Sequence, residues 1–467
     1  MTRLHSQPSS KPSRLRNTAK YLRPYAVLYP GSPNTGNVPE DFTPKHVPDK
    51  VRVLLLALFG LILAVTAFFL ASPSALFRGN LTILTSPANL LTDYIQLTDT
   101  GSTLLNAGLM CLIAVATVKA AGSGINGLMA AAVLTVTGFS FFGKNLLNSI
   151  PIVLGVYLFS KLARKPFSEY LVQALFGTAL GPLVSEIAFN LGLSVPAGLA
   201  LGFCAGLFTG LVLPPLSLHF KSFHKGFNLY NVGFTAGIIG MFFIAVLRAM
   251  GVEVATVSIL SKGNNRLFAA LLLSIFAVMF FAGLLLNGGR FKGLWRLQRQ
   301  PGGLGSDFIE RFGFGCAVMN MALLGLLCTT YVLAIGGEIN GPVIGGILTV
   351  TGFGAAGKNV KNVAPIILGV FIGNWLNVFE NVSTVAIVST LFGTTLAPVA
   401  GYYGPVWGIL AGLLHMALTM NISYLHGGMN LYNNGFSGGF IAAALVPVIT
   451  ALHEIRQKPR HERPQFE

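Results

Sequence analysis

One motif occurs twice in this chain, and its two copies start 214 residues apart. Residues 135–151 read TVTGFSFFGKNLLNSIP, and residues 349–365 read TVTGFGAAGKNVKNVAP. In each copy a lysine and two asparagines stand within otherwise apolar sequence. The same offset aligns further pairs of residues on either side of the motif: Arg52 with Arg266, Asp93 with Asp307, Asn106 with Asn320 and Asn126 with Asn340. The repeat therefore covers nearly the whole apolar part of the chain, and the fold must contain two similar halves.

The composition of the chain indicates whether these halves fold in water or in lipid. Hydrophobic residues make up 53% of the chain and charged residues only 10%, which does not suit a soluble protein of this length. Runs such as 51–71 and 267–286 are apolar enough to be spanning helices, which satisfy their own backbone in lipid. The first repeat has seven apolar segments, near 51–71, 102–121, 125–142, 147–163, 170–190, 195–218 and 229–250. The second has seven more, near 267–286, 314–335, 341–357, 363–378, 383–400, 405–424 and 431–452. We therefore expect an all-α membrane protein with about 14 hydrophobic segments.

Seven segments per repeat is an odd number, so the second repeat is expected to be inverted relative to the first. Charge gives an independent test of this topology. If every segment crosses the membrane, 26 of the 31 Lys and Arg residues fall on the side of the N-terminus. Because cytoplasmic loops are enriched in Lys and Arg, both termini are predicted to be cytoplasmic in a multi-pass protein of the plasma membrane.

The predicted boundaries follow from the same pattern. Residues 1–50 are expected to form a disordered basic cytoplasmic tail, and residues 453–467 a second cytoplasmic tail. The membrane repeats then occupy residues 51–252 and 253–452. An organellar transit peptide is the alternative interpretation of the first tail, because that tail contains Ser and Pro and has no acidic residue before Glu40.

The third and tenth segments, 125–142 and 341–357, contain the glycines and threonines of the duplicated motif. They either cross fully or are broken or re-entrant, and interrupted helices at matching positions point to a transporter site. Lys144 and Lys358 favour an anionic solute, since an ionisable group at membrane depth is costly. The alternative is that each lysine reaches the membrane surface from a helix end. The predicted solute-binding residues of this motif are Thr135, Thr137, Lys144, Asn145, Asn148, Thr349, Thr351, Lys358, Asn359 and Asn362.

A second duplicated motif follows later in each repeat, FHKGFNLYNVGF at 223–234 and LHGGMNLYNNGF at 425–436. Its side chains are predicted to line the same polar path: Asn228, Tyr230, Asn231, Asn430, Tyr432 and Asn433. The alternative is a capped helix start and turn. Candidate proton-coupling residues are His224 and His426, whose type titrates near neutral pH, and Glu186, an acid within an apolar segment.

Other classes of chemistry find little support. The sequence contains no nucleotide-binding loop, no metalloprotease motif and no triad-like grouping of Ser, His and Asp. The four cysteines, Cys111, Cys204, Cys316 and Cys328, show neither paired nor metal-ligand spacing. We therefore expect no catalytic residues, no metal and no cofactor, and the protein is not expected to be an enzyme. The formal charge of +16 is explained by the positive-inside bias rather than by binding of nucleic acid.

The duplicated Gly-Lys-Asn and Asn-Leu-Tyr-Asn motifs resemble a bacterial family of multi-pass membrane proteins catalogued as a domain of unknown function. The resemblance covers roughly residues 50–452 and implies an integral membrane protein without implying a substrate. The architecture also looks like that of the seven-plus-seven inverted-repeat transporters of nucleobases and anions, and is similar to that of the urea transporters. These likenesses transfer no residues, because fold does not fix function.

The sequence as a whole predicts a secondary transporter or permease for a small polar, anionic solute. A channel-like facilitator of a neutral solute such as an amide is the first alternative, and an intramembrane enzyme or scaffold is the second. The implied partners are the lipid bilayer and a small-molecule solute, and a homo-oligomer is left open.

Overall fold

The structure is a computed structural model that describes residues 43–88, 91–254, 258–376 and 382–457. Most of the predicted first tail and most of the second, residues 1–42 and 458–467, lie outside the described residues. The described part is nearly all helical. The exception is a parallel pair of two-residue strands, β1 (Leu91–Thr92) and β2 (Ser258–Ile259).

The first repeat begins at a helix that starts two residues before the predicted boundary. Its elements in chain order are α2 (Asp49–Leu70), α3 (Pro73–Thr85), α4 (Tyr94–Leu97), α5 (Thr100–Ala120), α6 (Gly127–Phe139), α7 (Leu146–Leu162), η2 (Phe167–Tyr170), α8 (Leu171–Gly177), η3 (Thr178–Leu180), α9 (Gly181–Phe189), α10 (Val195–Phe223) and α11 (Asn231–Ala249).

The second repeat has the same order of long and short helices. Its elements are α12 (Asn265–Leu286), α13 (Lys292–Leu297), α14 (Phe308–Phe312), α15 (Phe314–Ala334), α16 (Gly341–Phe353), α17 (Val360–Leu376), α18 (Thr384–Gly393), η4 (Thr394–Leu396), α19 (Ala397–Tyr403), α20 (Pro405–Ile422), η5 (Ser423–His426) and α21 (Asn433–Gln457). Helix α21 extends past residue 452, so the start of the predicted second tail is helical.

Ten helical segments in the described chain are long and apolar enough to cross a bilayer, and four shorter apolar helices accompany them. These are the 14 segments that the sequence predicted. The outer helices expose large apolar side chains, among them Leu54 and Phe69 on α2 and Val278 and Leu285 on α12. Such a surface is stable only when lipid covers it. The chain is therefore an integral, multi-pass membrane protein.

The third and tenth segments are short helices that end in a turn. Helices α6 and α16 have 13 residues each, which corresponds to about 20 Å of rise, less than the roughly 30 Å thickness of the hydrocarbon core. Both helices are buried, start at an asparagine cap (Asn126 or Asn340), and stop before the Gly-Lys-Asn sequence. The broken form of these segments is thus the one that the structure adopts.

The fifth and twelfth segments differ from the prediction. The sequence suggested one continuous segment at 170–190, but the structure interrupts it with the 3₁₀ turn η3, and the equivalent turn η4 interrupts its counterpart. Both turns lie within strongly apolar runs, so hydrophobicity alone could not reveal the change in helix type. Each turn begins with a buried threonine, Thr178 in η3 and Thr394 in η4.

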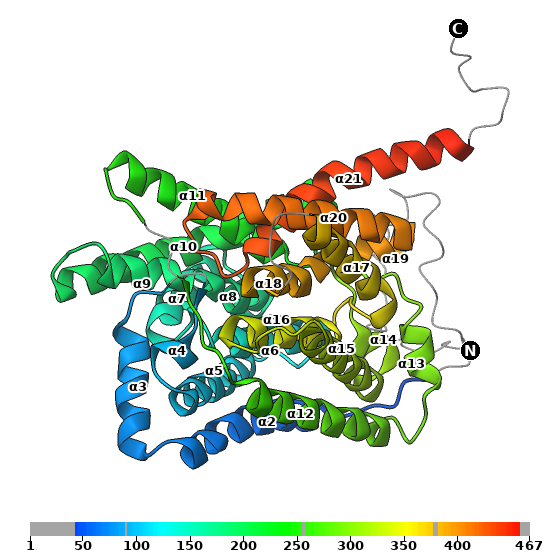
Figure 1. Ribbon diagram of the computed structural model, residues 1–467, viewed down its shortest axis with the longest axis horizontal. Coiled ribbons are helices and arrows are strands. Elements are labelled where there is room, and N and C mark those ends of the chain that lie inside the picture. The colour runs from blue at the N-terminus through cyan, green and yellow to red at the C-terminus, as the bar shows by residue number, and fades with distance from the viewer. Residues whose placement is uncertain (1–42, 89–90, 255–257, 377–381, 458–467) are drawn as a thin grey trace, which may run out of the picture. The chain divides into compact units, whose positions relative to one another are not determined.

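The two repeats meet along two pairs of equivalent helices. Helices α6 and α16 pack side by side (Figure 1). Gly138 near the end of α6 lies against Gly345 near the start of α16, and Gly352 lies against Ala131. The pair is therefore antiparallel, which is the relation expected of inverted repeats. Helices α11 and α21 also pack against each other.

Glycines also allow close packing of helices within each repeat, between α7 and α10 and between α17 and α20. A Cβ on Gly155 of α7 would lie 2.2 Å from the carbonyl oxygen of Leu207, and one on Gly369 of α17 would lie 2.0 Å from that of Ile409. Such contacts require the helix backbones to move apart. Helices α7 and α17 are thus held against α10 and α20 by backbone contact.

We expect the Gly155→Ala variant to be destabilised by about 1–3 kcal/mol, because overpacking forces the backbone to shift. The melting temperature of the purified protein in detergent measures this. Gly240→Ala on α11 is the control, since a Cβ there meets nothing closer than the side chain of His426 at 3.3 Å. Equal melting temperatures for the two variants would contradict the assigned packing.

Candidate functional site

The two lysines of the duplicated motif lie in the turns that follow α6 and α16, and both side chains are completely buried. Each turn is held by an asparagine from the preceding long helix. The Asn106 side-chain amide donates to the carbonyl oxygens of Ser140, at 2.7 Å, and Lys144, at 3.0 Å. Asn320 donates in the same way to Gly354 and Lys358. The lysine backbone is therefore fixed by the fold, and neither lysine extends to the surface.

The ammonium groups point to the 3₁₀ turns of the fifth and twelfth segments. Lys144 Nζ donates to Thr178 Oγ1 at 2.5 Å, and Lys358 Nζ donates to Thr394 Oγ1 at 2.7 Å. Sequence reasoning missed both threonines. The signal that could have found them is the repeated Phe-Gly-Thr sequence at 176–178 and 392–394, which marks equivalent residues at a slightly different offset.

The tyrosines of the second motif come from the opposite repeat. The Lys358 ammonium donates to the Tyr230 hydroxyl and lies 4.4 Å from the centre of the Tyr230 ring. Tyr432 packs on Phe139 with ring centres 4.7 Å apart, and the Lys144 ammonium lies 5.3 Å from the centre of the Phe139 ring. Each lysine therefore belongs to a cluster built from both repeats.

We call these groups the Lys144 cluster (Lys144, Thr178, Phe139 and Tyr432) and the Lys358 cluster (Lys358, Thr394, Phe353 and Tyr230). They are joined because the rings of Tyr230 and Tyr432 lie 4.9 Å apart, and Tyr230 also packs on Phe353 at 4.8 Å. A continuous row of aromatic rings thus runs between the two buried lysines.

The two clusters differ in one hydrogen bond. Tyr230 accepts from Lys358, whereas within the described chain no hydrogen bond joins Lys144 to Tyr432, whose hydroxyl lies beside that of Thr135. Among the described residues, the buried hydroxyls of Thr349 and Thr351 have no hydrogen-bond partner, while Thr137 donates to the carbonyl oxygen of Val133. The interior of the second repeat therefore keeps buried hydroxyls that the described side chains leave unpaired.

Within the described residues, no acidic side chain compensates the lysines. In the part of the chain that the structure describes, neither Lys144 nor Lys358 forms an ion pair. Asp93 instead accepts from the backbone amides of Ile95 and Ser261, and Asp307 from those of Gly127 and Glu310. The two aspartates therefore cap the short helices α4 and α14.

The predicted asparagines serve the backbone. Asn145 and Asn148 form a reciprocal cap at the start of α7, and Asn359 and Asn362 do so at the start of α17. Asn228 donates to the carbonyl oxygen of Gly435. Asn430 donates to that of Gly233. These contacts give the asparagines a structural role, and their binding of a solute stays a prediction.

The candidate proton-coupling residues are buried, and each pairs with an asparagine. His224 and His426 are buried and pair with Asn231, at 2.9 Å, and Asn433, at 2.8 Å. Glu186 is buried on α9 and accepts from the side chain of Asn190 at 2.7 Å. Their side chains are thus placed in the protein interior, and their role in proton movement stays a prediction.

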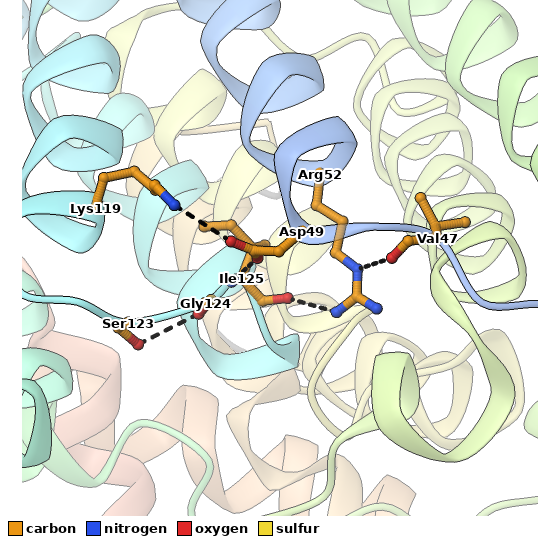
Figure 2. Close-up of polar contacts among 7 residues, drawn as sticks. All are labelled: Val47, Asp49, Arg52, Lys119, Ser123, Gly124 and Ile125. Carbon is orange, nitrogen blue, oxygen red and sulfur yellow. Dashed lines mark hydrogen bonds and ion pairs between the residues drawn. The ribbon is translucent and has the colours of Figure 1, made fainter.

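A polar cavity of about 540 Å³ lies at the amino end of α6. Figure 2 shows the contacts around it. Asp49 accepts from the backbone amide of Ile125 at 2.7 Å and lies 3.6 Å from the Lys119 ammonium. Arg52 donates to the carbonyl oxygens of Val47 and Ile125. The charged groups anchor the turn that leads into α6. They also make the lining of the cavity polar.

These features define a class of protein: an integral membrane protein of two inverted repeats, each with a broken helix and a buried lysine at the repeat interface. The chain belongs to the family described as protein of unknown function DUF1576, whose model matches residues 72–249 and 286–451. The two matched segments fall on the two repeats. No curated protein and no solved structure matches the chain.

Proposed function

We propose that the protein is a secondary transporter of a small anionic solute, with the Lys144 and Lys358 clusters on its path. The observation that carries this proposal is the burial of two lysines that pair with no acidic side chain among the residues that the structure describes. A lone buried charge is strongly unfavourable, so such residues persist where they meet a charge of opposite sign during function.

The arrangement of the clusters supports transport rather than static binding. Both clusters lie at the interface between inverted repeats, where rocking of one repeat against the other alternates access. Each cluster contains a lysine from one repeat and a tyrosine from the other, so relative movement of the repeats changes the lysine's surroundings. The charge distribution of the loops supports a plasma-membrane location with both termini in the cytoplasm.

The test is solute uptake into liposomes that contain the purified protein. We expect uptake of small anions, with a response to an imposed proton gradient, and at least roughly tenfold less uptake for Lys144→Gln and Lys358→Gln. Uptake of a neutral amide that survives both substitutions would instead favour a facilitator of neutral solutes. A protein that moves no solute from either group would overturn the transport proposal.

A further inference from the structure

An apolar cavity of about 180 Å³ adjoins the Lys144 cluster. It lies between α5, α6, α7 and α8, and the lipid-facing side chains of Ile113 and Leu154 stand at its wall. Thr178 also lines it, and Thr178 is the residue that accepts the hydrogen bond from Lys144. The cavity is thus separated from a buried ammonium by one hydroxyl group.

The two repeats carry side chains of different size at this place. Ala114, Thr117 and Ser149 line the cavity in the first repeat. The residues that correspond to them at an offset of 214 are Cys328, Tyr331 and Val363. Tyr331 is partly buried, and its hydroxyl donates to Thr390 at 3.3 Å. At these three positions the second repeat therefore carries the larger side chains.

The two lysines also differ in the number of hydrogen bonds that their ammonium groups donate. Lys358 donates to both Thr394 and Tyr230, whereas within the described chain Lys144 has a hydrogen bond to Thr178 alone. A lysine ammonium has three N–H donors. The Lys144 cluster therefore has both more unused hydrogen-bonding capacity and the adjoining space.

We propose that the Lys144 cluster binds a monocarboxylate with an apolar body, with the carboxylate at Lys144 and the body in the cavity. This inference rests on the proposed function and names the class of its solute. Charge complementarity selects the carboxylate, because an anion beside Lys144 removes the cost of an unpaired buried charge. The apolar lining selects the body, because filling the cavity removes apolar surface from water. At Lys358 the hydroxyl of Tyr230 occupies the position that corresponds to the carboxylate at Lys144.

The experiment measures thermal stabilisation of the full-length protein in detergent by sodium benzoate, acetate and nitrate. A ligand that binds the native state raises the melting temperature. We expect benzoate to stabilise the wild type at lower concentrations than acetate or nitrate. Thr117→Tyr places in the cavity the residue that the second repeat already carries, and Lys144→Met removes the charge. Each is expected to weaken benzoate binding by about tenfold or more, which corresponds to 1.4 kcal/mol.

The matched control is Lys361→Met, which removes an exposed lysine of α17 and is expected to retain benzoate affinity within about twofold. Thr117→Ser tests whether any change at position 117 disturbs the protein. Full benzoate binding by Thr117→Tyr, equal losses in the two lysine variants, or no stabilisation by benzoate would each overturn the inference. If anion uptake persists with any of these outcomes, the transport proposal still holds. If benzoate binds but no solute is taken up, the carboxylate site still holds and the transport proposal is wrong.

Discussion

Replacing Lys144 and Lys358 together with methionine is expected to lower anion uptake by at least about tenfold while raising the stability of the protein. Both side chains are fully buried, and neither has an acidic partner in the described parts of the chain. Methionine has nearly the same length, carries no charge and fits an apolar interior. We expect the free energy of unfolding to rise by roughly 1–3 kcal/mol, because two uncompensated charges leave the interior. Liposome uptake and thermal unfolding of one preparation measure both effects.

The control for this double substitution is Lys361→Met. Lys361 is exposed on α17, three residues after Lys358, so its loss is expected to change neither uptake nor melting temperature. A double variant that loses stability together with uptake would identify the lysines as structural residues. A double variant that is more stable and still takes up anions would remove the lysines from the transport path. Opposite changes in stability and activity are characteristic of functional sites.

The architecture could be read largely from the sequence, because its two main signals are long-range and redundant. One offset of 214 pairs Arg52 with Arg266, Asn106 with Asn320 and the two copies of the lysine motif, and it changes only later in each repeat. Apolar length then determines the helices, since a spanning segment has few alternatives in lipid. The depth of the broken segments was harder to predict. A Gly- and Thr-containing run such as 125–142 suits either a full crossing or a half-helix, and only the packing of α6 against α16 decides between them.

The lysines could be located from the sequence, but their surroundings could not. Thr178 and Thr394 lie in apolar runs that look like ordinary helix, and the 3₁₀ turns that expose their hydroxyls are set by tertiary packing. The tyrosines stood in the correct motif, yet nothing in one sequence says that Tyr230 meets the lysine of the opposite repeat. Inversion determines that pairing, since it places the second motif of each repeat beside the broken helices of the other. The asymmetry of Tyr230 and Tyr432 is likewise a property of the folded state.

Replacing Asn106 with leucine is expected to destabilise the protein by roughly 2–5 kcal/mol, because each buried carbonyl that loses its donor costs about 1–3 kcal/mol. The Asn106 amide donates to the carbonyl oxygens of Ser140 and Lys144. Both carbonyls belong to the turn that places Lys144, so anion uptake is expected to fall together with the melting temperature. This parallel loss distinguishes a residue that positions the lysine from the lysine itself, whose removal raises stability.

The equivalent variant, Asn320→Leu, sharpens this test. Asn320 donates to the carbonyl oxygens of Gly354 and Lys358 and in addition accepts from the side chain of Gln298 at 2.7 Å. Its replacement also removes the partner of the partly buried Gln298 side chain, so the melting temperature is expected to fall further than for Asn106→Leu. Asn421→Leu is the control, because the exposed Asn421 donates to the carbonyl of Ala417 within its own helix. If Asn106→Leu were as stable as Asn421→Leu, the turn would be held by helix packing, and the asparagine would not be what fixes the lysine.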